Sequence, residues 1–471
     1  MSSMACQMRF VISNEIIVIN PTKPVIDYVK NNLVLENSEH LKKQQMGFYT
    51  GNTPRHIHYY KKVGTSIIIP YGCIDDIRHI IKENEWEVDF ADVPVEHIPR
   101  NEIKLRDYQV AAVEAMYNAK NGILISPTGS GKSVCGMALI GKIGQKSLWI
   151  CNTTELANQA MDTYKNLFEA SDGDLGFIRE GNVEIGEKLT VAVVHTLSKV
   201  DIDRHTWGCV VADEIQFAIK SITNTAMFSR CLEMVATPRK YGLTALLHRS
   251  SGDEQRVKML VGNIKHEVPR HVVADNIMTP KLQRIDTGVE PSRAYLATDG
   301  TVEYVKLVGY IAEHQSRNQL IANNVAKDIL AGHSCLVLCD RVSQIEMIYD
   351  MLSAMPEVAD KVCMVTGSMT SKKGKAEREK AIEDMRSGVK RCLVASVALA
   401  GTGLDIVRLN KLHFVSLQKD AGKILQAAGR VSRAFEGKAQ PEILDYVDEQ
   451  IGYCVGAFKK RVRTYKKVGI K

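Results

Sequence analysis

The sequence lacks the features that mark membrane, secreted and metal-cluster proteins. No apolar run reaches the roughly 18 residues that a membrane-spanning helix needs, and residues 1–11 lack the charged start and long apolar stretch of a secretory signal. The 11 cysteines are an odd number and include no C-x-x-C pair, which argues against a disulfide framework and a structural zinc site. We therefore expect reduced thiols in a cytoplasmic compartment, no membrane segment and no identifiable protein partner.

Acidic residues are missing from the stretch between Val455 and Lys471, which nevertheless carries seven cations. Those positive charges equal the formal net charge of +7, so the rest of the chain balances to zero. A local cluster of this kind is expected of a contact with a polyanion. A solvated, frayed tail fits the same charge pattern equally well.

The rest of the sequence divides into three blocks. The chain has 471 residues, of which 45% are hydrophobic and 24% charged, so it can form two or three soluble domains. Residues 1–98 show strand patterns and helical spacing that predict a small α+β module, with a linker at 93–99. Residues 99–275 and 276–471 each alternate apolar strand patterns with helical segments. One of the strands expected in the second block covers residues 234–236.

This alternation predicts an α/β fold with two tandem parallel sheets, each covered by helices on both faces. Ligands of such sheets bind at the carboxyl ends of the strands. A cleft between two tandem domains is therefore the expected active site.

A glycine-rich segment, Ser126–Ser133, lies between a strand pattern and a predicted helix. Its small residues allow successive backbone N–H groups to curl around phosphate oxygens, and a helix N-terminus adds the positive end of its dipole. We expect Lys132 to reach the β- and γ-phosphates and the Ser133 hydroxyl to ligate Mg²⁺. The other residues expected to cradle the phosphates are Pro127, Thr128, Gly129, Ser130 and Gly131. Ser126 replaces the first glycine of the usual pattern, and the alternative is a glycine-rich turn with an incidental lysine.

Two further groups of charged residues complete the predicted site. Asp213 and Glu214 directly follow a buried strand pattern, where Asp213 can hold Mg²⁺ and Glu214 can polarise the attacking water. Arg430 and Arg433 are three residues apart in the third block, so they are expected on one helix face and could reach a γ-phosphate when the cleft closes. Each group also has an ordinary structural explanation, as acids that cap a strand and as a solvated basic helix face.

Across residues 103–450 this ordered series of motifs resembles superfamily 2 helicases, which hydrolyse ATP with Mg²⁺ between two RecA-like domains. Leu105–Gln109 resembles the adenine motif, which implies that Gln109 reads the base and that Arg106 also contacts the nucleotide. Asp213–Gln216 stands at motif II as DEIQ, Ala236–Arg239 at motif III, and residues 396–405 at motif V. The resemblance further implies nucleotide contacts by Gly403 and Asp405, and a coupling role for Gln216, Thr237 and Gln426.

The start of the motif series and the small N-terminal module resemble phage recombination and branch-migration helicases of the UvsW type. This implies an ATP-dependent helicase or translocase for forked and junction DNA in replication, recombination or repair, in the host cytoplasm if the protein is phage-encoded. The alternatives are a double-strand translocase that separates no strands, an RNA helicase and an ATP-switched nucleic-acid binder. DEAD-box RNA helicases differ in motif II and in their adenine motif.

A motor that runs over any sequence is expected to grip the phosphate backbone. Residues 152–159 resemble motif Ia and residues 195–197 resemble the next strand-contacting motif. With motif V they offer threonine hydroxyls for this, at Thr153, Thr154, Thr196 and Thr402, although each is also an ordinary strand-end or turn residue. In the N-terminal module, Arg55–Lys62 interleaves cations with rings, which suits phosphates and exposed bases. The residues expected to contact DNA there are Arg55, Tyr59, Tyr60, Lys61 and Lys62. A β-hairpin arm with half-buried tyrosines is the structural alternative.

Overall fold

The computed structural model describes residues 8–78, 80, 86–90, 92–202, 206–218, 227–247, 253–369, 371–400, 406–434 and 436–471. The chain forms two compact units. The first comprises Met1–Pro127 with Gly131–Pro269, and the second comprises Thr128–Ser130 with Arg270–Lys471. Within the described ranges, no helix is both long and apolar enough to cross a membrane. The sequence boundaries at 98 and 275 stay predictions.

The N-terminal module is built on a mixed sheet in the order β5-β6-β2-β1-β7. Its strands are β1 (Arg9–Ile12), β2 (Glu15–Ile19), β5 (Lys61–Val63), β6 (Ser66–Pro70) and β7 (Trp86–Val88). Alternate residues of the central strands, such as Ile16 and Val18, are buried. They pack with Val25 and Val29 of helix α1 (Lys23–Asn32) in one cluster. The period-2 pattern therefore places one face of this sheet in a core.

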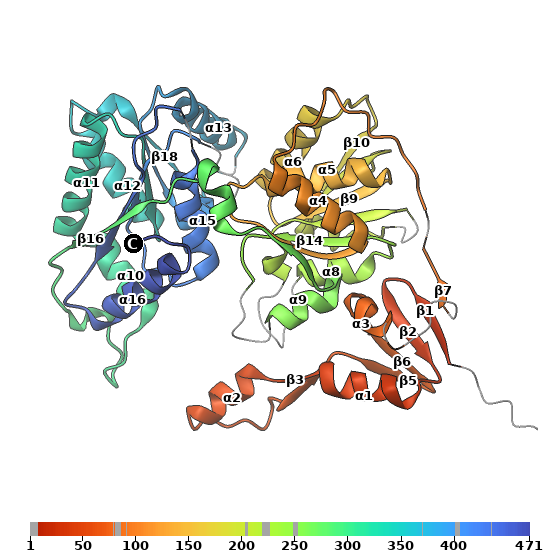
Figure 1. Cartoon of the computed structure of the whole chain (residues 1–471). Helices are drawn as coiled ribbons and strands as arrows, with labels where there is room; N and C mark the ends of the chain where they lie inside the picture. The colour runs from red at the N-terminus through yellow and green to blue at the C-terminus, as the bar shows by residue number, and fades with distance from the viewer. Residues whose placement is uncertain are drawn as a thin grey trace, which may run out of the picture. The chain divides into compact units, whose positions relative to one another are not determined.

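A short arm projects from this module. It consists of β3 (Val34–Glu36), α2 (Ser38–Gln45) and β4 (His56–His58), and β3 pairs with β4 in a two-stranded antiparallel sheet. Figure 1 shows α2 at the end of the module that lies away from α3 (Ile74–Arg78). The Arg55–Lys62 segment is thus divided between two sheets, with β4 in the arm and β5 in the main sheet. The alternative of a β-hairpin arm with half-buried tyrosines is confirmed in part, because β4 pairs with β3 in the arm and Tyr59 and Tyr60 are half-buried.

The first unit also contains a parallel sheet in the order β11-β10-β12-β9-β13-β14-β8-β15, in which β11 alone runs antiparallel to its neighbour among the described strands. The strands are β8 (Asn121–Ile125), β9 (Ser147–Cys151), β10 (Leu175–Arg179), β11 (Asn182–Glu184), β12 (Leu189–Val193), β13 (Cys209–Ala212), β14 (Lys240–Thr244) and β15 (Ile264–Glu267).

Helices cover both faces of this sheet (Figure 1). Leu148 and Ile150 of β9 belong to a core cluster with α8 (Met227–Met234) and α9 (Asp253–Val261), whereas Trp149 faces Gly136 of α5 (Lys132–Ile143). Helices α4 (Asp107–Ala119) and α6 (Thr154–Leu167) pack beside α5. Burial on both faces explains why the central strands read as continuous apolar runs.

The expected strand at 234–236 was wrong. The apolar residues Phe228, Cys231 and Leu232 are buried at helical spacing in α8, which ends at Met234. The strand is β14, whose sequence Lys-Tyr-Gly-Leu-Thr is buried at every position. Its ends, Lys240 and Thr244, are polar residues that find hydrogen-bond partners inside the protein, so the strand gives no apolar signal.

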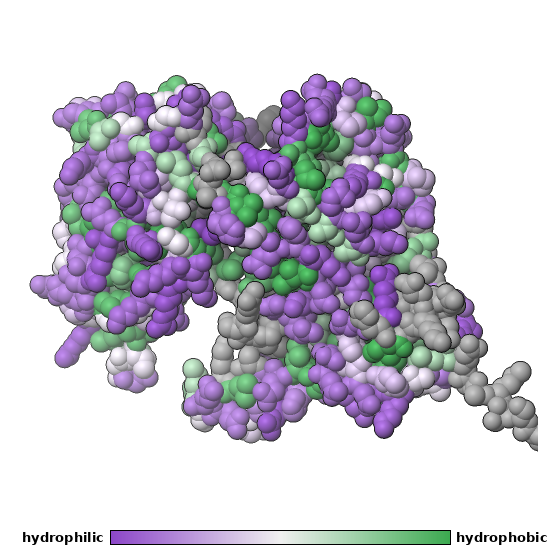
Figure 2. Space-filling view, in the orientation of Figure 1, coloured by the Kyte–Doolittle hydropathy of each residue, from purple (hydrophilic) through white to green (hydrophobic). Residues whose placement is uncertain are grey.

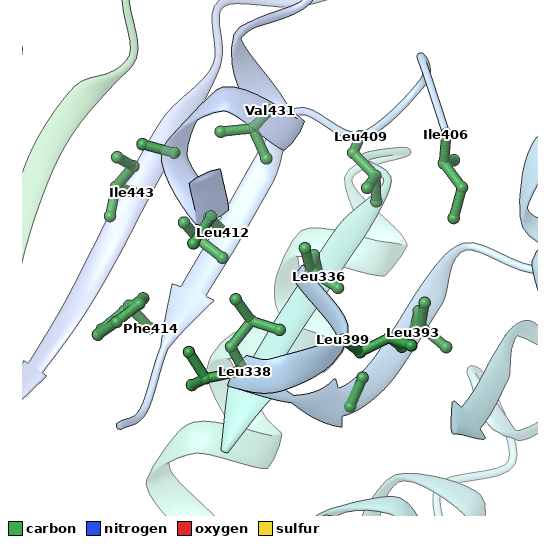
Figure 3. Close-up of a cluster of buried hydrophobic side chains, with 14 of the residues drawn as sticks. Leu336, Leu338, Leu393, Leu399, Ile406, Leu409, Leu412, Phe414, Val431 and Ile443 are labelled. Atoms are coloured by element: carbon green, nitrogen blue, oxygen red, sulfur yellow. The ribbon is translucent and has the colours of Figure 1, made fainter. Parts of the chain in front are cut away.

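The second unit holds a fully parallel sheet among its described residues, in the order β16-β21-β20-β17-β19-β18. The strands are β16 (Lys281–Asp286), β17 (Cys335–Cys339), β18 (Val362–Val365), β19 (Cys392–Ser396), β20 (Lys411–Phe414) and β21 (Glu442–Val447). Leu336 and Leu338 of β17 face a core that includes Ile424 and Val431 of α15 (Ala421–Ser432) (Figure 3). Val337 instead faces the layer of α11 (Gln315–Leu330) and α12 (Val342–Ser353). Both parallel sheets have the RecA-like arrangement that was predicted.

The basic C-terminal stretch is a helix rather than a frayed tail. Helix α16 (Gly452–Lys466) packs through Cys454, Ala457, Arg461, Thr464 and Tyr465, which are buried. The Arg461 guanidinium donates to both carboxylate oxygens of Asp445 at 2.9 and 2.6 Å, and both side chains are 0% exposed. Arg461 is therefore a structural cation. The other six cations of the stretch are exposed: Lys459, Lys460, Arg463, Lys466, Lys467 and Lys471.

Candidate nucleotide-binding site

The glycine-rich loop connects the last residue of β8 to the first residue of α5. Gly129 and Gly131 have φ angles of +87° and +85°, in the left-handed region that side chains with a Cβ rarely adopt. Gly131 is also the N-cap of α5, and the helix begins at Lys132. The loop therefore has the strand before it, the helix after it and the backbone curvature that a phosphate-binding loop requires.

Gln109 is held against the end of this loop. Its Oε1 accepts a hydrogen bond from the Arg106 backbone N–H at 3.0 Å, which forms one half of a capping box at the start of α4. A Cβ on Gly131 would lie 2.5 Å from Gln109 Nε2, so glycine is required there to admit the amide as well as for the positive φ. The arrangement brings the proposed adenine reader beside the phosphate loop.

Lys132, Asp213 and Glu214 form a nearly buried charge cluster. Lys132 Nζ lies 3.7 Å from Glu214 Oε1, and the two side chains are 9% and 13% exposed. Burial, followed by the negative charge of Glu214, raises the pKa of Asp213 to about 7, while Lys132 opposes the shift. Two adjacent carboxylates in this setting favour a bound cation. The donor set of Asp213 and the Ser133 hydroxyl consists of hard oxygens and fits Mg²⁺.

Glu214 adopts an uncommon backbone conformation. Its φ of +51° lies in the left-handed region, and its N–H donates to Asp213 Oδ1 at 3.0 Å. Outliers of this kind occur at functional sites, where the surrounding structure holds them in place.

Gln216 connects Glu214 to the next strand. Its Nε2 donates to Glu214 Oε2 at 2.5 Å, and its Oε1 accepts from the Thr244 hydroxyl at 2.6 Å. The Thr244 carbonyl in turn accepts from the backbone N–H of Ser126 at 2.9 Å, where the phosphate loop begins. Sequence reasoning missed Thr244 because it placed the strand at 234–236. Thr237, the predicted partner in coupling, is buried, and its hydroxyl bonds the backbone of Arg239 within the same turn.

In the second unit, Arg430 and Arg433 do not share a helix face, which corrects the prediction. Helix α15 ends at Ser432, and Arg433 continues in an extended conformation with φ −63° and ψ 130°. The backbone carbonyls at this end of the helix accept hydrogen bonds from residues outside it. The Ser432 carbonyl accepts from the Met278 N–H at 2.7 Å, and the Arg433 carbonyl accepts from Lys438 Nζ at 2.6 Å. Arg430 is 7% exposed, and burial lowers the pKa of Arg433.

Gln426 of α15 is also buried, and within the described part of the chain its Oε1 has no hydrogen-bond partner. A buried amide oxygen without a donor is costly, so this residue is ready for a further contact. The motif V residues Thr402, Gly403 and Asp405 lie outside the described residues.

The residues predicted to contact nucleic acid lie in different environments. Thr153 caps α6, where its hydroxyl accepts from the Leu156 N–H at 3.3 Å, and Thr154 follows it, half-buried. Thr196 is buried within the short helix α7 (Val194–Leu197). In the module the residues remain at the surface but have neighbours. Arg55 pairs with Glu36, Lys61 pairs with Glu15, the Tyr59 ring lies under the Arg256 guanidinium, Tyr60 meets the His58 ring edge-on, and Lys62 is exposed.

Known families match both sheets. Residues 102–249 match the family described as the type III restriction enzyme res subunit, and residues 317–435 match the helicase conserved C-terminal domain. A phosphate loop beside paired carboxylates, at the carboxyl ends of a parallel sheet, defines the class of nucleoside triphosphatases to which these families belong. More specifically, the chain is an ATP-hydrolysing helicase of superfamily 2.

Curated relatives agree with this assignment, and one solved structure supports the fold. The chain is 25% identical to a probable helicase of Escherichia phage T5, over 74% of this chain and 72% of the relative. It is 22% identical to a DNA 3'-5' translocase, XPB2, of Sulfurisphaera tokodaii, over 77% and 87%. The structure of S. cerevisiae Dbp5 bound to RNA and ADP BeF3 matches 77% of this chain and 88% of its own at TM-score 0.54 and 14% identity, which supports the fold. T4 UvsW matches 98% of both chains at TM-score 0.39 and 18% identity.

Proposed function

We propose that the protein is an ATP- and Mg²⁺-dependent DNA helicase or translocase that acts on forked and branched DNA. One observation carries the choice of branched substrates: the N-terminal module, which contains the Arg55–Lys62 segment, is packed directly against the parallel sheet of the first unit. A module held in this way can keep one duplex arm at a set angle to the motor sheet. The translocase among the relatives supports DNA as the substrate.

The junction between the module and the motor sheet is tightly packed. A Cβ on Gly72 would lie 1.9 Å from the Lys258 carbonyl oxygen, so the two backbones are in direct contact there. Met259 of α9 belongs to the core of the module. Asn263 Nδ2 donates to Asp76 Oδ1 at 3.0 Å, and Lys265 pairs with Asp75. Contacts of this density resemble a domain interior and favour a rigid connection.

The proposed roles within the ATP site combine the local positions of the residues with the resemblance to the superfamily 2 motifs. Lys132 and the loop from Pro127 to Ser133 hold the phosphates, Ser133 and Asp213 hold Mg²⁺, and Glu214 orients the attacking water. When bound, Mg²⁺ neutralises charge on the phosphate oxygens. We assign the adenine contact to Gln109 and a further nucleotide contact to Arg106. Charge stabilisation is assigned to Arg430 and Arg433, and coupling to Gln216, Thr237 and Gln426.

A second DNA contact is supported by helix α16. Lys459, Lys460, Arg463, Lys466 and Lys467 are exposed and recur at the spacing of one helix face, opposite the buried Ala457, Arg461 and Thr464. No acid interrupts this face. We propose that it follows a phosphate backbone and provides affinity without recognising a junction.

Unwinding assays on four substrates test the proposal: a fork, a four-way junction, a linear duplex with a single-stranded tail, and double-stranded RNA. We expect ATP-dependent activity on the two branched DNAs above that on the linear duplex, and none on RNA, with Lys132→Ala as the inactive control. Multi-turnover phosphate release with and without DNA distinguishes a motor from an ATP-switched binder. Strand displacement distinguishes a helicase from a translocase that separates no strands. Equal activity on branched and linear DNA contradicts the junction preference.

Point substitutions in the intact chain separate the two surfaces, because deletion of residues 1–98 would expose the core around Met259. The triple substitution Lys459→Ala, Lys460→Ala and Arg463→Ala should weaken binding to all DNAs alike and flatten the salt dependence by roughly 0.7 to 0.9 slope units per lost phosphate contact. The substitutions Arg55→Ala and Lys62→Ala should lower the ratio of junction unwinding to single-strand-stimulated ATPase. An unchanged ratio rules out these two cations as junction contacts.

A further inference from the structure

The tip of the arm, Met46–Tyr49, exposes large apolar side chains. Met46 is 67%, Phe48 63% and Tyr49 82% exposed. Figure 2 shows hydrophobic colour over the region of α2, beside hydrophilic side chains. Single exposed apolar residues are common, but several at the end of a projecting arm indicate a site for a partner.

The backbone of the tip is well defined. Gly47, with φ +71°, lies two residues after Gln45, the last residue of α2. The Phe48 N–H donates to the Lys43 carbonyl at 2.8 Å, and the Gly47 N–H donates to the Gln44 carbonyl at 3.1 Å. This pair of bonds is the Schellman motif. The turn therefore fixes the direction in which Phe48 leaves the helix.

Phe48 lacks the usual packing partner of this motif. An apolar residue at its position commonly packs on the residue five positions before it, which here is Lys43. The Lys43 Nζ donates to the Thr53 hydroxyl at 2.7 Å and pairs with Glu39 at 3.0 Å. The lysine is thus used to tie α2 to the returning chain, and the Phe48 ring remains in solvent.

The Tyr49 ring lies against a glycine. A Cβ on Gly51 would lie 2.0 Å from the Tyr49 hydroxyl oxygen and 2.2 Å from the ring carbon that bears it. The hydroxyl end of the ring therefore lies beside the Gly51 backbone, where a Cβ at that position would stand. With the side chain still 82% exposed, the ring is supported at this edge and open to solvent elsewhere. An aromatic ring positioned in this way loses little conformational freedom on binding.

The charge around the tip favours a polyanionic partner. The sequence has no Asp or Glu from His40 to Ile74, whereas the same stretch contains Lys42, Lys43, Arg55, Lys61 and Lys62. Three of these cations pair with acids outside the stretch: Arg55 with Glu36, Lys43 with Glu39 and Lys61 with Glu15. Lys62 is exposed, and aromatic rings in a stretch that has cations and no acids of its own are typical of surfaces that stack on bases and hold the backbone beside them.

We propose that Phe48 and Tyr49 stack on unpaired bases where a DNA duplex opens. The inference rests on the proposed function and deepens it, because it assigns the junction contact of the module to the arm tip in addition to the cations between Arg55 and Lys62. Bases inside an intact duplex are covered by their neighbours, whereas unpaired bases at a fork offer free faces. The tip therefore recognises the opened strand, and the basic residues behind it hold the phosphates.

The experiment uses full-length protein without ATP and a fork that carries 2-aminopurine at the first unpaired position. We expect the wild-type protein to change the fluorescence of this base on binding. The double variant Phe48→Ala/Tyr49→Ala should lose most of that change and bind the fork about tenfold more weakly, since base stacking on one ring is worth roughly 5- to 150-fold in affinity. Its affinity for blunt duplex should change less than about twofold. Phe48→Tyr/Tyr49→Phe should restore both signals.

Tyr304→Ala is the matched control, because Tyr304 is a partly exposed aromatic residue, at 44%, in the second unit. Fluorescence change and fork affinity equal to wild type in the double variant overturn the proposal and point to a protein partner for the tip. A loss that is equal on blunt duplex also overturns it. Absence of unwinding by the wild-type protein contradicts the proposed function instead, because the stacking signal is measured without ATP.

Discussion

Lys132 Nζ lies 3.7 Å from Glu214 Oε1, so the cation of the phosphate loop and the proposed catalytic carboxylate are neighbours before any nucleotide is considered. The two side chains are nearly buried, and the ion pair partly neutralises their charges. A hydrogen bond from Gln216 also holds the Glu214 carboxylate. The phosphate loop and the acid that follows β13 therefore form one cluster, although 82 positions separate the two residues in the chain (214 − 132).

Lys132→Ala should remove most ATPase activity, because the positive charge on the β- and γ-phosphates is lost. Glu214→Gln should retain ATP binding while turnover stops, because its proposed role concerns the water. Equilibrium binding of a fluorescent ATP analogue, together with steady-state phosphate release, measures both effects. Normal turnover by Glu214→Gln would sink its assignment as the catalytic base.

Gln216→Ala should lower kcat for ATP by about 10- to 100-fold, as is typical when a group that orients a reacting side chain is removed. The KM for ATP should change little, because Gln216 contacts Glu214 and Thr244 rather than the phosphate loop directly. Thr244→Val, which removes the other end of the same bridge, should have the same direction of effect. An increase in KM without a change in kcat would assign Gln216 to nucleotide binding instead.

The fold was predictable wherever burial leaves a simple trace in the sequence. Strands buried on both faces, such as β9 and β17, appear as apolar runs, and the phosphate loop appears as glycines between a strand and a helix. Strand β14 was missed because Lys240 and Thr244 satisfy their polar groups inside the protein. The end of α15 was missed because Met278, which is distant in sequence, bonds the carbonyl of its last residue, Ser432.

Removal of either arginine at the end of α15 should affect turnover more than nucleotide affinity. Arg430→Ala and Arg433→Ala are expected to lower the DNA-stimulated ATPase rate, and arginine fingers can contribute roughly 10³- to 10⁵-fold. Arg386→Ala is the control, since this exposed arginine pairs with Glu383 at 3.6 Å in the same unit. If both variants hydrolyse ATP at the wild-type rate, the assignment of these arginines is wrong.

Asp445→Ala should strongly destabilise the second unit, because it leaves the buried Arg461 without its carboxylate. Breaking one side of a buried ion pair typically costs about 3 to 5 kcal/mol. Replacement of both residues, as Asp445→Leu/Arg461→Met, should recover most of the loss, because no buried charge remains. The free energy of unfolding from urea titrations checks this. A double variant that is no more stable than the single one contradicts the ion-pair explanation.

Lys240 should make stability rise with pH above neutrality. Its ammonium group is buried in β14, donates to the Leu232 carbonyl at 2.8 Å and lies 4.6 Å from the centre of the Tyr71 ring. Burial lowers the pKa of Lys240 from 10.5 to about 7, and the nearby acids Glu233 and Glu15 offset only part of that shift. Burial in turn raises the pKa of Glu233.

The sign of the effect follows from proton binding. Below pH 7 both the folded and the unfolded states carry the proton, so the cost of the buried charge is fully present. Between pH 7 and 10.5 the unfolded state binds more protons, and the free energy of unfolding increases with pH, by up to about 4 to 5 kcal/mol over the whole window. Lys240→Met should therefore be more stable than wild type at pH 6, and its free energy of unfolding should not increase between pH 7 and 10.5.

Lys258→Met is the control, because Lys258 pairs with Glu254 at 2.8 Å near the surface. Urea midpoints measured from pH 6 to 9.5 compare the three proteins, and parallel curves for wild type and Lys240→Met would show that Lys240 keeps an ordinary pKa in the folded protein.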